Sequence, residues 1–154
     1  MQTDKTGFAD ALLRWHETHA RDLPWRGEAD PYRIWLSEIM LQQTRVEAVK
    51  PYFERFLKEL PTVKDLAEVE EDRLLKLWEG LGYYNRVRNM QKAARQIMEQ
   101  HHGEFPDTYD EILSLTGIGS YTAGAVSSFA FGIPKPAVDG NVLRVLTRVL
   151  SCDE

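Results

Sequence analysis

The sequence contains a single cysteine, Cys152, among its 154 residues. One thiol excludes a disulfide within the chain and any metal site that needs several thiolates from these residues. No segment reaches about 18 consecutive apolar residues, and residues 1–10 lack the basic and then apolar run of a signal peptide. We therefore expect a protein of the reducing cytoplasm with no membrane contact.

The sequence also lacks the sustained apolar and polar alternation that is typical of β-strands. Its turn-forming residues stand instead where helices begin or end. Asp30 followed by Pro31 is a favoured helix start. Capping-box spacing recurs at three pairs: Thr44 with Glu47, Thr62 with Asp65, and Thr108 with Glu111. Glycines at 80, 103 and 132 are placed to end helices. These signals together predict an all-α fold.

Basic residues are in the minority overall, with 19 against 24 acidic residues and a net charge of −5. Residues 1–72 hold 10 basic and 15 acidic side chains, whereas residues 73–154 hold 9 of each. An acidic chain is a poor partner for a polyanion when its charge is evenly spread. Since the acidic surplus is confined to the first half, the net charge does not exclude a nucleic-acid surface in the second half.

The helix expected from Pro31 to about Gln43 carries apolar residues around nearly its whole circumference, which predicts a buried central helix. Glu38 stands inside this run, with mostly apolar neighbours one turn away and no cation on its face. Burial raises the pKa of an unpartnered carboxyl group. Glu38 is therefore a candidate general acid.

Residues 115–124, LTGIGSYTAG, predict a helix-hairpin-helix. Gly117 and Gly119 let the backbone approach a phosphate and direct free N–H groups at it, near the positive end of the following helix. Such contacts hold a nucleic-acid backbone without reading its sequence. The alternative is a plain glycine helix end followed by a closely packed helix.

Asp139 follows a stiff segment with two prolines and stands at the expected start of another helix. Alone, it could serve only as that helix's N-cap. Together with Glu38 it makes a pair of carboxyl groups in contrasting environments, one buried and one hydrogen-bonded, which drives their pKa values apart. Such a pair suits cleavage of a glycosidic bond.

Three segments offer flat rings and amides of the kinds that stack on bases or fill gaps in a duplex. They are residues 23–26, 42–44 and 81–84. A basic stripe follows the last of them and consists of Arg86, Arg88, Lys92 and Arg95. The stripe is either a solvated helix face or a surface that binds DNA.

Taken together, these segments resemble the helix-hairpin-helix DNA glycosylase superfamily, and within it the MutY-type adenine DNA glycosylases. The resemblance extends from about Leu23 to Leu150 and is most specific at residues 31–44, 80–84 and 138–142. It implies a base-excision-repair enzyme that removes adenine mispaired with 8-oxoguanine or guanine in double-stranded DNA.

The resemblance also implies roles for individual residues. Glu38 matches the acid that protonates the flipped adenine at N7 and then assists water, and Asp139 matches the carboxylate that stabilises the sugar cation. Asn141 matches the amide that supports Asp139, and Tyr121 a residue close to Glu38. The adenine pocket is implied at Trp25, Arg26 and Leu41. Contacts with the duplex are implied at Gln42, Gln43, Thr44, Leu81, Tyr83, Gly117 and Gly119.

Tyr121 stands where the related endonuclease-III-like glycosylase/lyases place a lysine. An amine there forms a Schiff base with the sugar, which a phenol cannot do. The resemblance therefore implies a monofunctional enzyme with water as the nucleophile. The alternatives are a glycosylase/lyase of the endonuclease III type and a non-catalytic DNA-binding module.

The resemblance divides the chain into three parts. Residues 1–22 form an N-terminal helix of a second subdomain, residues 23–136 a six-helix module, and residues 137–154 the start of an iron-sulfur subdomain. Family members carry a four-cysteine [4Fe-4S] loop after this point, and one cysteine cannot hold such a cluster. We therefore expect an N-terminal fragment without cofactor or metal, monomeric and associated with the bacterial nucleoid in the cytoplasm.

Overall fold

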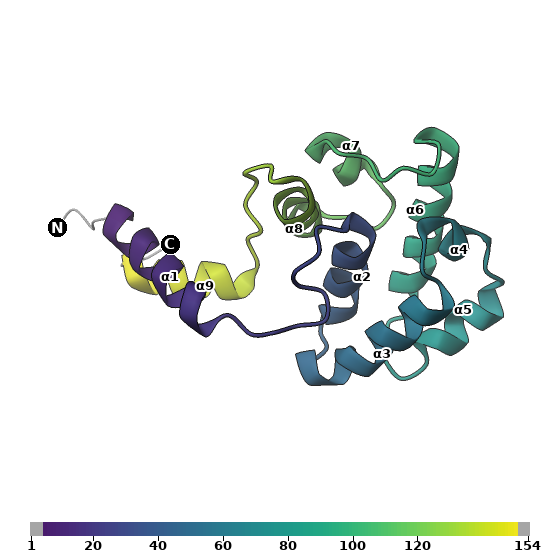
Figure 1. Cartoon of the computed structure of the whole chain (residues 1–154), viewed down its shortest axis with the longest axis horizontal. Coiled ribbons are helices and arrows are strands. Elements are labelled where there is room, and N and C mark those ends of the chain that lie inside the picture. The colour runs from purple at the N-terminus through teal and green to yellow at the C-terminus, as the bar shows by residue number, and fades with distance from the viewer. Residues whose placement is uncertain (1–4, 151–154) are drawn as a thin grey trace. The chain divides into compact units, whose positions relative to one another are not determined.

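The computed structural model describes residues 5–150, and within that range the chain forms helices and no strand. The prediction of an all-α fold is confirmed. The helices are α1 (Lys5–His19), α2 (Pro31–Leu41), α3 (Val46–Glu59), α4 (Val63–Glu68), α5 (Glu71–Trp78), α6 (Asn85–Gln100), α7 (Tyr109–Ser114), α8 (Ser120–Phe131) and α9 (Gly140–Leu150) (Figure 1). None of these helices is long and apolar enough to cross a membrane.

The helices belong to two compact units. The larger unit, Pro24–Ala137, contains α2 to α8, and the smaller unit joins the two ends of the chain, up to Leu23 and from Val138. Helix α9 of the smaller unit has no buried residue. Large apolar side chains are exposed on both of its helices, namely Leu12, Leu13, Trp15, Leu143, Val145 and Val149. The described part of the smaller unit therefore has little core of its own.

Helix α2 lies inside the larger unit, where it packs against α3 and α8 (Figure 1). Asp30 begins the helix by accepting a 2.9 Å hydrogen bond from the Tyr32 N–H, and Pro31 takes the first helical position. Its buried residues are Tyr32, Ile34, Trp35, Leu36, Ser37, Ile39 and Met40. The predicted buried central helix is confirmed. It ends at Leu41, because the next residue, Gln42, is extended with a ψ of 116°, and Gln43 then adopts a left-handed φ of 58°.

The predicted helix caps are only partly present. Thr62 and Asp65 form the complete capping box at the start of α4, and the Thr108 hydroxyl accepts from the Glu111 N–H. The expectation for Thr44 is wrong: α3 begins after Arg45 with no side-chain cap. The Thr44 hydroxyl instead donates a hydrogen bond to the Gln42 carbonyl. Local hydrogen bonds of this kind, between a side chain and nearby backbone, compete with helix capping. The glycines at 80, 103 and 132 all have positive φ, as helix-ending glycines do.

Aromatic residues fill the space between α2, α3 and α5. The Phe56 and Trp78 rings meet edge to face with centroids 6.0 Å apart, and both side chains are fully buried. The buried Tyr32 hydroxyl donates a 2.9 Å hydrogen bond to the Leu60 carbonyl, which ties α2 to the end of α3. Burial raises the pKa of Tyr32, so this hydroxyl keeps its proton. The core thus holds α2 in a fixed position.

Gly124 allows the segment before Asp139 to lie directly on α8. A Cβ atom at this position would overlap the carbonyl oxygen of Pro136 and lie 3.5 Å from the Ala137 Cα. The absence of a side chain therefore sets how closely residues 136 and 137 approach the helix.

Gly124→Ala is expected to lower the free energy of unfolding by about 1–3 kcal/mol, because the added methyl group forces this backbone away from α8. Urea unfolding of the two proteins measures the difference. Gly140→Ala is the control, since no atom lies within 4 Å of a Cβ there. Equal stability of wild type and Gly124→Ala would contradict the packing argument.

Candidate active site

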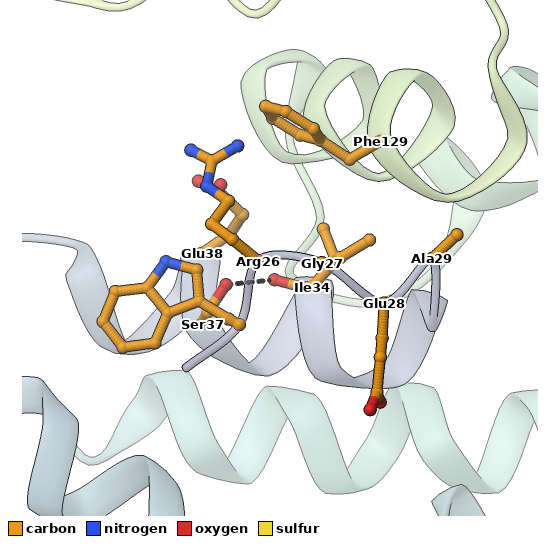
Figure 2. Close-up of a pocket in the computed structure, with 9 residues that line it drawn as sticks. Arg26, Gly27, Glu28, Ala29, Ile34, Ser37, Glu38 and Phe129 are labelled. Atoms are coloured by element: carbon orange, nitrogen blue, oxygen red, sulfur yellow. Dashed lines mark hydrogen bonds between the residues drawn. The ribbon is translucent and has the colours of Figure 1, made fainter. Parts of the chain in front are cut away.

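A cavity of about 210 Å³ opens between the loop before α2, one face of α2, and α8. Its lining consists of Trp25, Arg26, Gly27, Glu28, Ala29, Ile34, Ser37, Glu38 and Phe129 (Figure 2). Two of the three predicted pocket residues, Trp25 and Arg26, therefore share a cavity with the predicted acid. Leu41 is not among the lining residues and is half-buried at the end of α2.

Glu38 projects from the otherwise apolar helix α2 into this cavity. Burial raises the pKa of its carboxyl group above the ordinary value of 4.5. The positive charge of Arg26 and a hydrogen bond from the Tyr121 side chain act in the opposite direction and reduce the rise. The net effect favours the protonated form, as a general acid requires.

Arg26 lies over the Phe129 ring, with its guanidinium carbon 4.2 Å from the ring centroid. In Figure 2 the Arg26 side chain and the Glu38 carboxylate lie on the same side of α2, whereas Glu28 points away from them. Glu28 instead forms an ion pair with Arg33, with 2.8 Å between its Oε2 and the Arg33 Nη1. Arg26 is thus the cation held at the mouth of the pocket.

Phe129 is a pocket residue that the sequence reasoning missed. Its position could have been found from Tyr121, because residues eight apart on a helix lie close to the same face. The two side chains come from one helix, α8, and one lines the cavity while the other hydrogen-bonds Glu38. Helix α8 therefore supplies one wall of the pocket.

Asp139 belongs to the smaller unit and begins α9 there. Its carboxylate accepts a 2.8 Å hydrogen bond from the Val142 N–H and a 3.4 Å bond from the Asn141 side-chain amide. The backbone N–H of Val142 is the main reason why the pKa of Asp139 is lowered, with Asn141 adding to the effect. Asp139 is therefore both a helix cap and a carboxylate held in its ionised form.

The helix-hairpin-helix is present as α7, the turn at residues 115–119, and α8. Gly117 has a φ of 79°, and a Cβ atom there would lie 2.7 Å from the Asn89 Cβ. Gly119, which precedes α8, has no atom near a Cβ position, so packing within the protein does not require glycine there. The Thr116 N–H donates a 2.8 Å bond to Gln96 and so anchors the turn to α6.

The predicted duplex contacts differ in their exposure. Gln42, Gln43 and Tyr83 are exposed, with 67% of Tyr83 accessible, and Thr44 is half-buried. Leu81 is buried, with only 7% exposed, because its turn folds back on Trp78. In this conformation Leu81 supports the turn from inside and does not present its side chain to a partner.

Three members of the basic stripe make hydrogen bonds or ion pairs within the fold, so the stripe is not a row of unpaired charges. Arg86 donates to the main-chain carbonyls of neighbouring turns, Arg88 pairs with Glu71 at 2.7 Å, and Arg95 donates to the Ala67 carbonyl. A helical spacing of basic residues does not reveal that their hydrogen-bonding groups are used within the fold. The fourth residue, Lys92, is exposed.

No group of three or more potential metal ligands occurs among the described residues. Cys152 lies outside them, and a [4Fe-4S] cluster needs thiolate ligands that the rest of this sequence lacks. The residues of this chain therefore do not fit the cluster that the resemblance associates with longer family members.

Comparison with known proteins identifies the family of this chain. Residues 36–154 match the family model of the HhH-GPD superfamily base excision DNA repair protein. The chain is 45% identical over 145 residues to an adenine DNA glycosylase of Buchnera aphidicola subsp. Baizongia pistaciae, covering 94% of this chain and 41% of that protein. It is 44% identical to the adenine DNA glycosylase of Homo sapiens, covering 94% of this chain and 28% of that protein.

Two solved structures are similar in fold. A thermostable thymine-DNA glycosylase superposes with a TM-score of 0.87 at 31% identity, covering 92% of this chain and 66% of that one. An endonuclease III in a non-covalent DNA complex superposes with a TM-score of 0.81 at 27% identity, covering 97% and 72%. The chain thus spans less than half the length of these two curated relatives, but most of the length of the compared structures.

Glu38→Gln is expected to raise the melting temperature at neutral and alkaline pH. Because the folded-state pKa is raised, the folded protein is destabilised once Glu38 ionises, and a neutral amide avoids that cost. The gain should be absent below the ordinary value of 4.5, grow as the pH rises from there to the raised pKa, and stay constant above it. Thermal unfolding followed by circular dichroism across this range measures it.

Glu54→Gln on the exposed face of α3 is the matched control for the exchange of a carboxylate for an amide. If Glu38→Gln lowered the melting temperature increasingly as the pH rose, the carboxylate would be a stabilised ion and the assignment of its raised pKa would fail.

Proposed function

The chain belongs to the HhH-GPD superfamily of base excision DNA repair proteins, and we propose that it forms the catalytic core of an adenine DNA glycosylase. The proposed substrate is double-stranded DNA in which adenine is paired with 8-oxoguanine or guanine. The observation that carries the proposal is a pocket with one carboxyl group of raised pKa, Glu38, hydrogen-bonded by Tyr121. Similarity to adenine DNA glycosylases supports the choice of base.

Glu38 acts first as the general acid. Its carboxyl proton passes to N7 of the flipped adenine, the bond between the sugar C1′ and the base breaks, and the bonding electrons leave with the adenine. The carboxylate left on Glu38 then accepts a proton from water as the water oxygen bonds to C1′. A pKa raised by burial serves the first step, because the acid must still hold its proton near neutral pH.

Asp139 supplies the negative charge that stabilises the oxocarbenium-like sugar. Hydrogen bonds from Val142 and Asn141 keep its pKa low, so it remains ionised while Glu38 is protonated. The two carboxyl groups thus differ in protonation because one is buried and the other is hydrogen-bonded at a helix start. Asn141 positions Asp139 and takes no proton itself.

The hairpin supplies the proposed contact with the DNA backbone. No side chain caps the N-terminus of α8, and no atom lies within 4 Å of a Cβ position at Gly119, the residue before the helix, which suits the close approach of a phosphate to this helix start. Contacts of this type give affinity without sequence preference. This suits an enzyme that recognises a mispair in any surrounding sequence.

Glu38→Gln is expected to reduce adenine release by about 10²-fold or more, since the amide cannot donate the proton. Single-turnover assays on a duplex with one adenine opposite 8-oxoguanine, made with the whole gene product, measure this. Glu54→Gln should leave the rate unchanged. Retention of full activity by Glu38→Gln would remove Glu38 from the mechanism, and an inactive wild type would favour a DNA-binding module.

Borohydride treatment separates water from amine chemistry. A monofunctional enzyme forms no Schiff base, so no covalent protein–DNA adduct is expected on an adenine substrate. A trapped adduct would instead favour the alternative of a glycosylase/lyase. The absence of lysine at position 121 supports the first outcome.

The alkaline limb of the pH–rate profile is expected to move to higher pH in Arg26→Met. The Arg26 charge lowers the pKa of Glu38, so its removal leaves the acid protonated over a wider range. Excision rates measured from acidic to alkaline pH give the position of the limb, which is independent of any overall loss of affinity. Arg55→Met on α3 is the control, and a limb displaced to lower pH would contradict the assignment.

A further inference from the structure

Two exposed residues of the larger unit are held in strained backbone conformations. Gln43 has a φ of 58° and Tyr83 a φ of 48°, and among the described non-glycine residues His102 alone shares this feature. Left-handed backbone at such residues is unfavourable and persists only where surrounding interactions enforce it. Some interaction must therefore hold both turns, although neither side chain is buried.

Arg86, near the start of α6, makes that interaction. One guanidinium nitrogen, Nη1, donates to the Ile39 carbonyl at 2.7 Å and to the Gln42 carbonyl at 2.6 Å. The other, Nη2, donates at 3.2 Å to both the Leu81 and the Gly82 carbonyls. One side chain thereby joins the end of α2 to a turn about 40 residues further along the chain.

Ring contacts hold the guanidinium in place. Its carbon lies 5.4 Å from the Trp78 ring centroid and 5.7 Å from that of Tyr83. A planar fork with fixed N–H directions can reach carbonyls on two sides at once, and a lysine ammonium on a flexible stem cannot reproduce that arrangement.

The two joined turns border one groove. Gln42 and Gln43 line it from the end of α2, and Tyr83 and Tyr84 line it from the other turn, with Arg86 between them. The groove has a volume of about 390 Å³ and lies outside the pocket of Glu38. Exposed amides and a tyrosine ring on its rim can stack on bases or fill a gap in a duplex.

We propose that Arg86 is a positioning residue that sets the distance between the Gln42–Gln43 turn and the Tyr83 turn, so that both enter the DNA duplex as one preformed unit. This inference rests on the proposed function for its ligand, a duplex with an adenine mispair. Arg86 acts through the two turns: its four main-chain hydrogen bonds are already made within the protein, and the exposed side chains reach the DNA.

Arg86→Lys tests the proposal because it retains the charge but loses the fork. In this variant the rate constant of adenine release per active site should fall about tenfold when adenine lies opposite 8-oxoguanine. It should fall much less when adenine lies opposite guanine, because the displaced turns recognise the opposite base poorly. Active-site titration corrects for unfolded protein. An equal loss on both substrates would mean a purely structural role and would overturn the proposal.

A double-mutant cycle gives a second readout. Tyr83→Ala should lower the same rate, and Tyr83→Ala combined with Arg86→Lys should be little slower than the worse single variant, because the arginine acts through the turn. Fully additive losses would overturn the proposal. Arg73→Met, which removes an exposed arginine of α5, controls for the loss of positive charge and should match wild type.

Binding separates this inference from the proposed function. The probe is a duplex with 2-aminopurine next to the mispair, whose fluorescence rises when neighbouring bases unstack. Wild type should raise the fluorescence even if it releases no adenine, and Arg86→Lys should reduce the rise. An undiminished rise would overturn the proposal that Arg86 positions the two turns. If Arg86→Lys does not fold, Arg86→Gln, which retains an amide donor, replaces it with the same criteria.

Discussion

The larger unit depends on one constraint, which is that a carboxyl group must be accommodated on a helix whose other residues are mostly buried. Helix α2 contributes Trp35, Leu36 and Met40 to the core, each with essentially no exposed surface. Glu38 shares that helix but faces the cavity, so its carboxyl group is only partly desolvated. Burial of the helix therefore both stabilises the fold and raises the pKa that the proposed chemistry uses.

The remaining parts of the larger unit can be understood as support for this arrangement. Helix α8 closes the pocket with Phe129 from its last turn and provides Tyr121 to the carboxyl group from its first turn, which follows the glycine turn of the hairpin. A single helix thus connects the proposed base pocket with the proposed grip on the backbone. Gly124 on the same helix sets the path of the segment that leads to Asp139.

Arg86 illustrates why a basic residue cannot be assigned to DNA from its spacing alone. Its position after an aromatic turn suggested a surface for phosphates, yet its two terminal nitrogens donate to four carbonyl groups. Those bonds compensate the strain at Gln43 and Tyr83, which hydrogen bonding to charged groups is strong enough to do. In the proposed complex with DNA, Arg86 therefore acts through the shape of two turns and less through its charge.

Much of the fold was determined by the sequence itself, because local signals act over one or two helical turns. Asp30 with Pro31, and Thr62 with Asp65, begin helices as predicted, and the apolar circumference of α2 required a buried position. The candidate acid followed from the same pattern. The resemblance implied that Tyr121 lies close to Glu38, but only the tertiary structure placed Phe129 over Arg26 and Arg86 between two distant turns. These contacts join residues far apart in the chain, and periodicity carries no information about them.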